Sequence, residues 1–533
     1  MKGGKPRQRG RQRGRGRRGA TPRRAAEAVD ALLREGLGSR GFPDALEAEA
    51  REAARTAGKR ARGRRDLAEL PTFTVDPASA HDFDDAVSAR REGGGFRLWI
   101  HIADVTAHVR PEFGLDLEAR RRANSTYAPG TSEPMLPRAL SEEACSLAPG
   151  VERLAVTAEI ELGPGGEPGP ASFYRSLVRS DSRLDYDQLD EVFAGRRSAP
   201  SRVAEPLAVA RDAAAALGER RSATTLDVES FEPEFSFDAG GEVTAARAVP
   251  QTEAHRLIER LMILANECVA ELLERRRVPT VYRVHEQPDP PRIERLVGQL
   301  ASLGVPTPAL RKGISPREAG ELAAEASRLV IREARRRGHG REAYTSLVLR
   351  SLKQARYDAA NAGHAGLGSP AYCHFTSPIR RYPDLLVHRA LLGALGEGEE
   401  GPSARLAADA AWHCSERERD SAKLERGADD VCAAFLLRRE LAERGRERSF
   451  EGEVSGVVRS GAFVSFGGEL GDVYEGFVPA RTMKGEYFEL NEVETALVGR
   501  AGGRAVRLGD PVSVQVERVE APRGRVDLRP ADG

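Results

Sequence analysis

Residues 73–102 read FTVDPASAHDFDDAVSARREGGGFRLWIHI, and the arrangement of much of the chain can be worked out from them. Phe73-Thr74-Val75-Asp76 has the β-branched and aromatic composition of a short strand. Residues 86–90 and 96–102 are two further strand-like runs, separated by Glu92-Gly93-Gly94-Gly95, which is typical of a turn. The stretch therefore predicts a strand followed by a β-hairpin, with a polar loop between them.

The loop between strand and hairpin holds four aspartates within ten residues: Asp76, Asp82, Asp84 and Asp85. Like charges at this range raise each other's pKa and destabilise the loop unless a cation lies among them. Carboxylates, waters and phosphate oxygens are preferred ligands of Mg²⁺. Two Mg²⁺ ions about 4 Å apart would neutralise the four carboxylates and hold a phosphodiester. We therefore predict a magnesium site at the mouth of the hairpin.

Two structural alternatives compete with a magnesium site. An acidic surface loop needs no ligand, and it is the better explanation for a random Asp-rich stretch. A calcium-binding EF-hand loop needs Gly at its sixth position and Glu at its twelfth. Counting from Asp82, those positions are Val87 and Gly93, so the EF-hand alternative fails. The D-x5-D-x-D-D spacing after a strand favours the magnesium site over the surface loop.

Composition divides the 533 residues into four parts. Residues 1–24 form a Gly/Arg-rich basic arm that has nothing to bury and is predicted to be disordered. Residues 25–65 are a helical lead-in that ends in a basic cluster. Residues 66–447 form a large α+β domain, and residues 449–530 alternate strand-like runs with Gly-rich turns, which predicts a small closed β-barrel. Helices of the large domain are expected at residues 252–275, 316–337, 384–395 and 403–447.

Hydrophobic residues make up 40% and charged residues 31% of the chain, as in a globular protein. No apolar run approaches the roughly 18 residues that span a bilayer, and no secretory signal follows the basic N-terminus. The five cysteines are scattered, so neither a CxxC zinc site nor a disulfide framework is indicated. These features predict a cytoplasmic protein without a membrane partner, and a monomer.

The net charge of +1 conceals an asymmetry. Residues 1–24 contain eleven Lys or Arg and no acidic residue, so the remaining 509 residues carry 71 basic and 81 acidic side chains, a net charge of −10. An acidic body does not hold a polyanion through its overall charge. If the protein binds nucleic acid, basic groups must be concentrated in the arm and in a channel.

Several separated stretches together resemble one known family. They are LPTFTVDPASAHDFDDAV, LWIHIADV, PMLPRALSEEACSL, AHRLIERLMILANE, VYRVHE and HFTSPIRRYPDLLVHR. These resemble the ribonuclease II and ribonuclease R exoribonucleases, whose catalytic unit is the RNB domain, and the likeness covers most of residues 66–530. VSGVVRSGAFVSF, residues 454–466, resembles an S1-type OB domain. The expected fold is α+β: an RNB domain with a mixed sheet flanked by helices, then an S1-type barrel.

The resemblance implies a 3′-to-5′ hydrolytic exoribonuclease that degrades single-stranded RNA processively, from its 3′ end, to nucleoside 5′-monophosphates. It implies that Asp76, Asp82, Asp84 and Asp85 hold two Mg²⁺ ions. Asp84 matches the aspartate whose loss stops hydrolysis while RNA binding persists. Arg380, in FTSPIRRYPD, matches the arginine that engages the phosphate at the cut, which makes Asp84 and Arg380 the expected catalytic pair.

The resemblance also implies RNA contacts. Tyr127, in NSTYAPG, and Tyr282, in VYRVHE, match an aromatic pair that clamps terminal bases, and stacking of about 1–3 kcal/mol per base tolerates any sequence. Strand alternation alone would place Tyr282 in the core. Arg381 lies beside Arg380 on a turn stiffened by proline and is expected to contact RNA. Glu425, in KLERGADD, matches a glutamate near the terminal ribose, and a solvated charge on a helix face is an equal alternative.

The sequence also departs from the family pattern. The family carries two cold-shock OB domains ahead of the RNB domain, and with only about 65 residues there this chain is expected to lack them. We hypothesise that the Arg-rich arm replaces their phosphate contacts. In the barrel, Phe463, Phe466 and Phe477 are candidates for a stacking surface, although some aromatics must fill the barrel core.

Two alternatives to the exoribonuclease are a non-catalytic RNA-binding protein on the same fold and a DNA exonuclease with similar metal chemistry. A pseudo-enzyme would be free to lose its carboxylates, and all four aspartates are present here, so catalysis is favoured. Selection of RNA over DNA depends on contacts to the ribose 2′-hydroxyl, which a sequence does not display.

Overall fold

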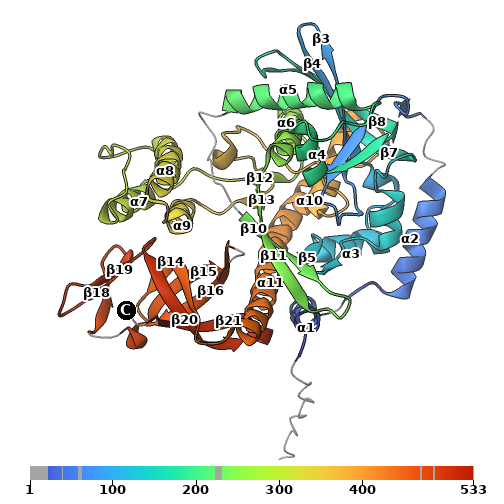
Figure 1. Ribbon diagram of the computed structural model, residues 1–533. Helices are drawn as coiled ribbons and strands as arrows, with labels where there is room; N and C mark the ends of the chain where they lie inside the picture. The colour runs from blue at the N-terminus through green and yellow to red at the C-terminus, as the bar shows by residue number, and fades with distance from the viewer. Residues whose placement is uncertain are drawn as a thin grey trace, which may run out of the picture.

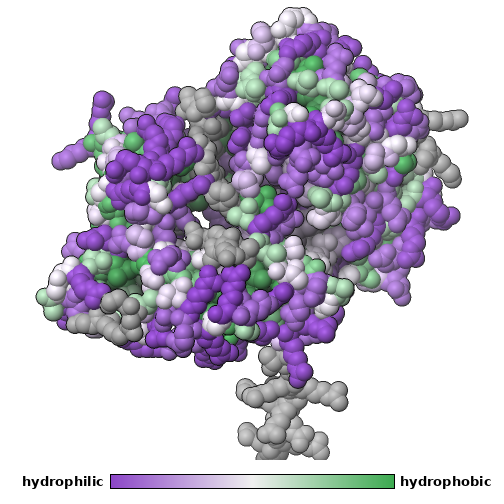
Figure 2. All heavy atoms as spheres, viewed as in Figure 1, coloured by the Kyte–Doolittle hydropathy of each residue, from purple (hydrophilic) through white to green (hydrophobic). Residues whose placement is uncertain are grey.

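The computed structural model describes residues 22–38, 40–57, 63–221, 231–468, 471–483 and 486–531 (Figure 1). Nearly all of the basic arm predicted at residues 1–24 lies outside these ranges, so its disorder stays a prediction. Within the described ranges, no helix combines the length and the apolar character needed to cross a membrane. The face of the molecule seen in Figure 2 is mainly hydrophilic, with small apolar patches scattered over it.

A seven-stranded mixed sheet lies at the centre of the larger part of the chain, as predicted. Its order is β1-β8-β7-β4-β3-β2-β9, with bounds β1 Arg65–Asp66, β2 Phe73–Asp76, β3 Asp85–Glu92, β4 Gly95–Ala103, β7 Glu152–Leu162, β8 Pro168–Arg179 and β9 Ser182–Asp185. The pairs β1–β8 and β2–β9 are parallel, and the other neighbours are antiparallel.

The predicted hairpin is confirmed, with a shorter turn than expected. Strands β3 and β4 pair along their whole lengths, up to Glu92 opposite Gly95, so that only Gly93 and Gly94 connect them. The φ angles of these two glycines are 58° and 83°. A two-residue type I′ turn requires such left-handed values, which glycine adopts without steric cost.

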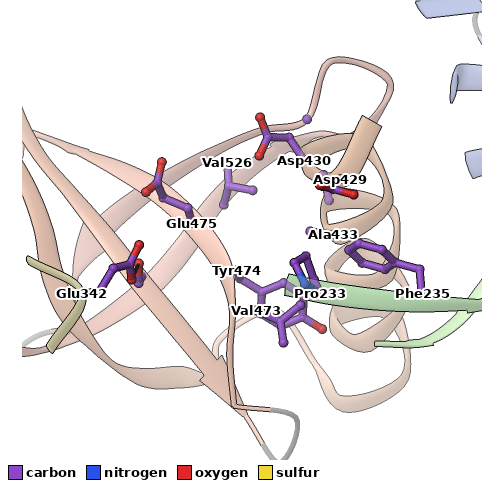
Figure 3. Close-up of a pocket in the computed structure, with 13 residues that line it drawn as sticks. Pro233, Phe235, Glu342, Asp429, Asp430, Ala433, Val473, Tyr474, Glu475 and Val526 are labelled. Carbon is purple, nitrogen blue, oxygen red and sulfur yellow. Dashed lines mark hydrogen bonds between the residues drawn. The ribbon is translucent and has the colours of Figure 1, made fainter. Parts of the chain in front are cut away.

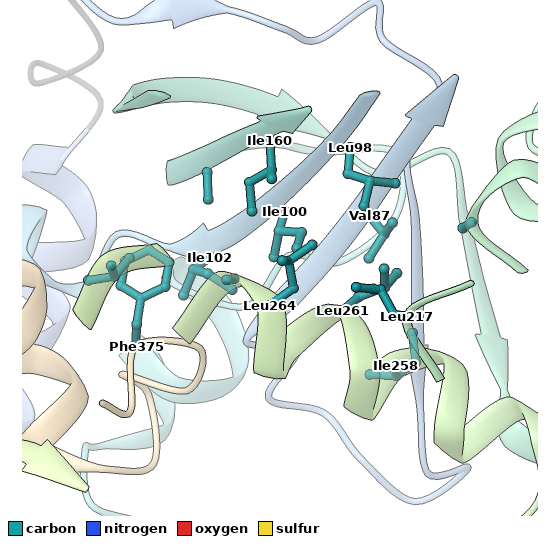
Figure 4. Packing of buried hydrophobic residues seen from close by; sticks show 14 of the residues in the cluster. Val87, Leu98, Ile100, Ile102, Ile160, Leu217, Ile258, Leu261, Leu264 and Phe375 are labelled. Atoms are coloured by element: carbon teal, nitrogen blue, oxygen red, sulfur yellow. The ribbon is translucent and has the colours of Figure 1, made fainter. Parts of the chain in front are cut away.

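Three helices cover one face of the sheet: α4 (Tyr186–Phe193), α5 (Ala204–Arg221) and α6 (Glu253–Arg275). Helix α6 is the helix predicted at residues 252–275. Figure 4 shows Val87 and Ile100 of the sheet packed against Leu261 and Leu264 of α6. Burial of one such side chain stabilises the fold by about 1.5–3 kcal/mol, so this layer fixes the hairpin on the helices.

The opposite face of the sheet packs against α2 (Asp44–Thr56), α3 (Gly114–Arg122), α10 (Tyr382–Leu395) and the first turns of α11 (Ala404–Arg444). This face also contains a buried polar row. His101 on β4 makes hydrogen bonds with Ser88 Oγ at 3.1 Å and with Thr157 Oγ1 at 2.9 Å. Burial lowers the pKa of His101 to about 3, so it is a neutral, structural residue of the sheet.

Helix α11 leads from the sheet domain to a closed five-stranded barrel, which confirms the predicted fold of the C-terminal part. The barrel order is β14-β15-β16-β21-β20, with bounds β14 Ser449–Val458, β15 Gly461–Gly468, β16 Gly471–Pro479, β20 Pro511–Glu520 and β21 Arg525–Pro530. A small sheet of β17 (Phe488–Leu490), β18 (Ala496–Gly499) and β19 (Ala505–Arg507) lies between β16 and β20 in the chain. Apolar residues of α11 and of α1 (Ala25–Leu37) join the barrel core.

Helices α7 (Pro290–Ser302), α8 (Pro316–Arg337) and α9 (Arg341–Ser351) form one apolar cluster with the barrel, and Figure 1 places them beside it. The remaining strands form three short pairs: β5 (Thr126–Ala128) with β6 (Thr131–Glu133), β10 (Phe231–Phe237) with β11 (Val243–Pro250), and β12 (Tyr282–Val284) with β13 (Arg356–Asp358). The helices predicted at residues 316–337, 384–395 and 403–447 correspond to α8, α10 and α11.

Candidate active site

The acidic loop begins at Asp76, where β2 ends, and closes at Asp85, where β3 begins. Strand β2 lies between β3 and β9 in the sheet, so both ends of the loop are anchored on neighbouring strands. The sheet therefore holds the predicted carboxylates together at one of its ends.

Side chains from outside the acidic loop fix its backbone. Arg183 on β9 donates to the carbonyl oxygens of residues 77 and 78, at 2.8 and 2.9 Å. Ser146 Oγ donates to the His81 carbonyl at 2.8 Å and accepts the Phe83 N–H at 3.0 Å. The loop is thus held in one arrangement by the surrounding protein rather than splayed into solvent.

Asp84 is the most buried of the four aspartates, with 4% of its surface exposed. Its Oδ1 accepts a hydrogen bond from the Ile379 N–H at 2.8 Å, across 295 residues of sequence. Its Oδ2 lies 3.6 Å from Arg380 Nε. Residues 377–381, here called the arginine turn, immediately precede α10. The fold thus brings together the two stretches that the sequence analysis singled out.

The carboxylates of the acidic loop repel one another at a site that excludes much of the solvent. Burial, followed by the charge of Asp85, raises the pKa of Asp76 to about 8. Burial also raises the pKa of Asp85 to about 6 and the pKa of Asp84 well above its ordinary value. Arg380 opposes all three shifts. The neighbouring arginines therefore do not fully offset the cost of ionising these groups.

A divalent cation fits this donor set. Asp76 Oδ2 and Asp84 Oδ2 are buried and accept no hydrogen bond from the described residues, and such unsatisfied oxygens are costly. A cation beside them would satisfy both oxygens and offset the repulsion. In the described part of the chain, no group of three or more His, Cys, Asp or Glu side chains is already arranged to hold a metal ion. The fit therefore rests on the chemistry of the donors.

A cavity of about 260 Å³ lies between α11, the end of α3 and the arginine turn. Its lining includes four of the five residues predicted to contact RNA: Tyr127, Arg380, Arg381 and Glu425. Tyr127 donates its hydroxyl to Asp82 Oδ2 at 2.9 Å, which ties the cavity to the acidic loop. The Tyr127 N–H donates to Glu425 Oε1 at 2.8 Å, so Glu425 holds the tyrosine backbone in place.

The two adjacent arginines have different surroundings. Arg381 donates to both oxygens of Asp384, at 2.9 and 2.8 Å, and Asp384 is completely buried at the start of α10. The side chain of Arg380 is 46% exposed, and its hydrogen bond to Ser377 Oγ is long, at 3.3 Å. Arg381 is thus engaged in holding the turn on α10, whereas Arg380 can reach a phosphate in the cavity.

Tyr282 lies apart from the Tyr127 cavity. It is 5% exposed and belongs to the apolar core on the face of the sheet that α4, α5 and α6 cover. It lines a different cavity, together with Arg277 and Asn361. This buried position agrees with the one that strand alternation alone predicts for Tyr282. The structure does not bring the two tyrosines of the predicted aromatic pair to one cavity.

Three further residues of the site carry no sequence pattern that would mark them. Tyr357 on β13 and Glu418 on α11 line the same cavity as Tyr127. Burial, followed by the charges of two aspartates of the acidic loop, raises the pKa of Tyr186 at the start of α4. Tyr186 therefore lies within electrostatic reach of the carboxylates. These residues come from elements far apart in sequence, and only the fold unites them.

The three phenylalanines predicted as candidates for a stacking surface differ in their exposure in the barrel. Phe466 is fully buried and packs its ring on those of Phe450 and Tyr474. Phe463 is 37% exposed, and its ring centre lies 5.1 Å from that of Phe477. Phe466 is therefore a core residue, and Phe463 with Phe477 forms an aromatic pair at the barrel surface.

A second cavity, of about 160 Å³, lies where the barrel meets α11 and β10 (Figure 3). Figure 3 shows the carboxylates of Asp430 and Glu475 on either side of Val526, and Glu342 also lines the cavity. Burial raises the pKa of Asp430 and of Glu475. Among the described residues, no arginine or lysine lines this cavity, so it lacks the basic groups that would hold a phosphate there.

Comparison with known proteins divides the chain in the same way, into the sheet domain and the barrel. Residues 64–397 match the family model described as the RNB domain, and residues 445–529 match the S1 RNA binding domain. Ribonuclease R of Vibrio parahaemolyticus serotype O3:K6 is 35% identical over 480 residues, covering 87% of this chain and 56% of that protein. Ribonuclease R of Escherichia coli K12 is also 35% identical over 480 residues, covering 87% and 57%. This chain thus spans a little more than half the length of these relatives.

Among solved structures, Mycoplasma genitalium RNase R in complex with ribose methylated single-stranded RNA superposes with a TM-score of 0.85. The two sequences are 25% identical, and the superposition covers 95% of this chain and 78% of that chain. The likeness in fold therefore extends over both the sheet domain and the barrel.

Proposed function

The chain belongs to the RNB-domain family and carries an S1 domain after the RNB domain, and from this premise we propose that it is a 3′-to-5′ exoribonuclease. Its substrate would be single-stranded RNA, hydrolysed processively to nucleoside 5′-monophosphates. We propose further that Asp76, Asp82, Asp84 and Asp85 hold Mg²⁺, as two ions.

One observation carries this proposal: the acidic loop meets the arginine turn beside a cavity lined by an exposed tyrosine. An ordinary acidic surface loop gives no reason to bury Asp84 or to leave carboxylate oxygens without hydrogen bonds. Cleavage of a phosphodiester needs charge stabilisation at the phosphate and a means of holding the strand. The residues at this junction can supply both.

Each residue of the site then has a defined task. Divalent cations bound by the carboxylates would neutralise charge on the phosphate and lower the pKa of the attacking water. The Arg380 guanidinium would bind a phosphate oxygen and stabilise the charge that develops on it. Tyr127, which is 42% exposed, would stack on a base near the 3′ end. Glu425 would accept a hydrogen bond from a ribose hydroxyl, and Arg381 would position the turn that carries Arg380.

The test is incubation of the purified chain with a 5′-labelled single-stranded oligoribonucleotide. With Mg²⁺ we expect a ladder that shortens from the 3′ end, and with EDTA no ladder, because the carboxylate cluster acts on a phosphate only through its cation. Addition of excess Mg²⁺ should restore the ladder, and mass spectrometry should identify nucleoside 5′-monophosphates. Internal cleavage, or an unchanged ladder in EDTA, would contradict the proposal.

A non-catalytic RNA-binding protein on the same fold is the alternative, and the position of Tyr282 is the observation that favours it. With Tyr282 in the core, only one aromatic side chain of the predicted clamp lines the cavity. This alternative predicts that RNA binds but is not shortened with any divalent cation. An oligodeoxyribonucleotide of the same sequence, assayed in parallel, tests whether the chain acts on DNA instead.

Deletion of residues 1–24 should lower RNA affinity and flatten its dependence on salt. Those residues supply eleven positive charges, whereas the rest of the chain has a net charge of −10. Each phosphate that the protein no longer neutralises should reduce the slope of log K against log salt by about 0.7 for a single strand. Fluorescence anisotropy in EDTA, at several salt concentrations, measures both quantities. A variant in which the arm keeps its length but has Gln for Arg is the matched control, and slopes equal to the intact chain in both variants would reject the idea.

A further inference from the structure

Trp412 on α11 is 69% exposed, and it is one of only two tryptophans in the chain. The other, Trp99, is 4% exposed and lies under the guanidinium of Arg90. A large aromatic ring left in water gives up the stabilisation that burial would bring. Trp412 therefore offers a large aromatic surface to a binding partner.

Trp412 borders a hollow of about 570 Å³ between α3 and α11. We call this surface the α3–α11 patch, and its residues are Leu117, Arg120, Arg121, Ala408, Asp409, Trp412 and His413. Arg121 pairs with Glu118 at 2.7 Å, and Asp409 faces Arg405 at 3.8 Å. Arg120 forms no ion pair with any residue in the described ranges. The patch thus combines an exposed indole with a guanidinium that has no ion-pair partner in the described ranges.

The α3–α11 patch and the cavity of the candidate active site are lined by the same two chain segments. Arg120 and Arg121 lie in the last turn of α3, and Ala123 and Asn124, which follow, line the Tyr127 cavity. On α11, Cys414 lines that cavity and comes directly after the two patch residues. His413 Nε2 lies 3.3 Å from the Arg121 carbonyl oxygen, which links the two segments. The patch and the cavity are therefore lined by neighbouring residues of the same two chain segments.

We propose that the α3–α11 patch is a second binding position for single-stranded RNA, upstream of the 3′ nucleotides held in the cavity. A base stacks on the Trp412 indole, and a backbone phosphate binds Arg120. The place of the patch on the two segments that also line the cavity favours the same polyanion as the occupant, and Arg120, without an ion pair in the described ranges, can bind a phosphate. This inference rests on the proposed function for its substrate class, but the contacts themselves require only that the chain binds RNA.

Tryptophan fluorescence tests the proposal directly, because Trp99 is buried and Trp412 is in water. In EDTA, an oligoadenylate of about 20 nucleotides should quench the emission of the intact chain, and one of about four nucleotides, which fills only the cavity, should not. In Trp412→Phe the quenching should disappear. Trp412→Ala should weaken binding of the longer RNA by about 5- to 100-fold, and Trp412→Phe by less, since a phenyl ring still stacks.

Arg120→Ala should reduce the salt slope for the longer RNA by about 0.7 and leave that for the shorter RNA unchanged. Leu310→Ala, which removes another exposed apolar side chain, is the matched control and should change neither. Unchanged fluorescence with the longer RNA, or equal affinity of Trp412→Ala and the intact chain, would overturn the proposal. So would a concentration-dependent dimer, seen by sedimentation, that Trp412→Ala abolishes while RNA binding stays intact, because the patch would then bind a second copy. Loss of hydrolysis with quenching retained would instead count against the proposed function alone.

Discussion

Asp84→Asn is expected to stop hydrolysis of RNA, lowering the rate by about 10³-fold or more, with RNA affinity unchanged or slightly higher. Asp84 supplies the most buried carboxylate of the acidic loop, and its Oδ2 accepts no hydrogen bond from the described residues, so a cation would stabilise it. Charge stabilisation at a phosphate is worth several kcal/mol, and each 1.36 kcal/mol is tenfold in rate. Affinity is retained because the amide removes a negative charge from beside the phosphate.

The asparagine variant should remain folded. Its side-chain oxygen can still accept the Ile379 N–H, and the change removes a charge whose burial is costly. Thermal unfolding in EDTA should therefore give a midpoint at or above that of the unchanged chain. Asp187→Asn, a change of the same kind at a 73% exposed position on α4, is the control and should hydrolyse RNA normally. A lowered midpoint in Asp84→Asn, or activity within tenfold of the control, would contradict the assignment.

The acidic loop could be predicted from sequence because its four carboxylates lie within ten residues of one another. Carboxylates this close in sequence also lie close together in the folded chain, because a strand and a hairpin fix both ends of the loop. The same holds for the hairpin and for the long helices, whose apolar periodicity is local. Even there, the observed turn is shorter than the predicted one. Only two glycines connect the strands of the hairpin, because the strands pair further toward the turn than expected.

The walls of the cavity could not be predicted in the same way. Tyr357 and Glu418 belong to β13 and α11, and no local pattern relates either of them to the acidic loop. Tyr282 shows the converse: the resemblance implied an RNA contact, whereas its alternation in a strand agrees with the buried position observed. The barrel phenylalanines are similar, because Phe463 and Phe466 are separated by three positions and a strand turns such residues to opposite sides. Which side is the core is decided by barrel closure.

Arg380→Ala and Arg381→Ala should fail in different ways although the residues are adjacent. Arg380→Ala is expected to lower the hydrolysis rate by about 10²- to 10³-fold, as for loss of one donor that stabilises developing charge. Its effect on stability should be small when Mg²⁺ is present, because the side chain is 46% exposed and its approach to Asp84, 3.6 Å, is longer than a hydrogen bond. Single-turnover hydrolysis at saturating RNA measures the chemical step.

Arg381→Ala should instead lower the free energy of unfolding by about 3–5 kcal/mol, because it leaves the completely buried Asp384 without its ion-pair partner. Urea unfolding measures this loss, and the double variant Arg381→Ala with Asp384→Asn should recover part of it. Activity of Arg381→Ala, assayed where it is folded, should exceed that of Arg380→Ala, since the guanidinium that reaches the cavity is still present. Equal activity loss in two folded variants would mean that both arginines bind the phosphate, and the division between a binding and a positioning arginine would be wrong.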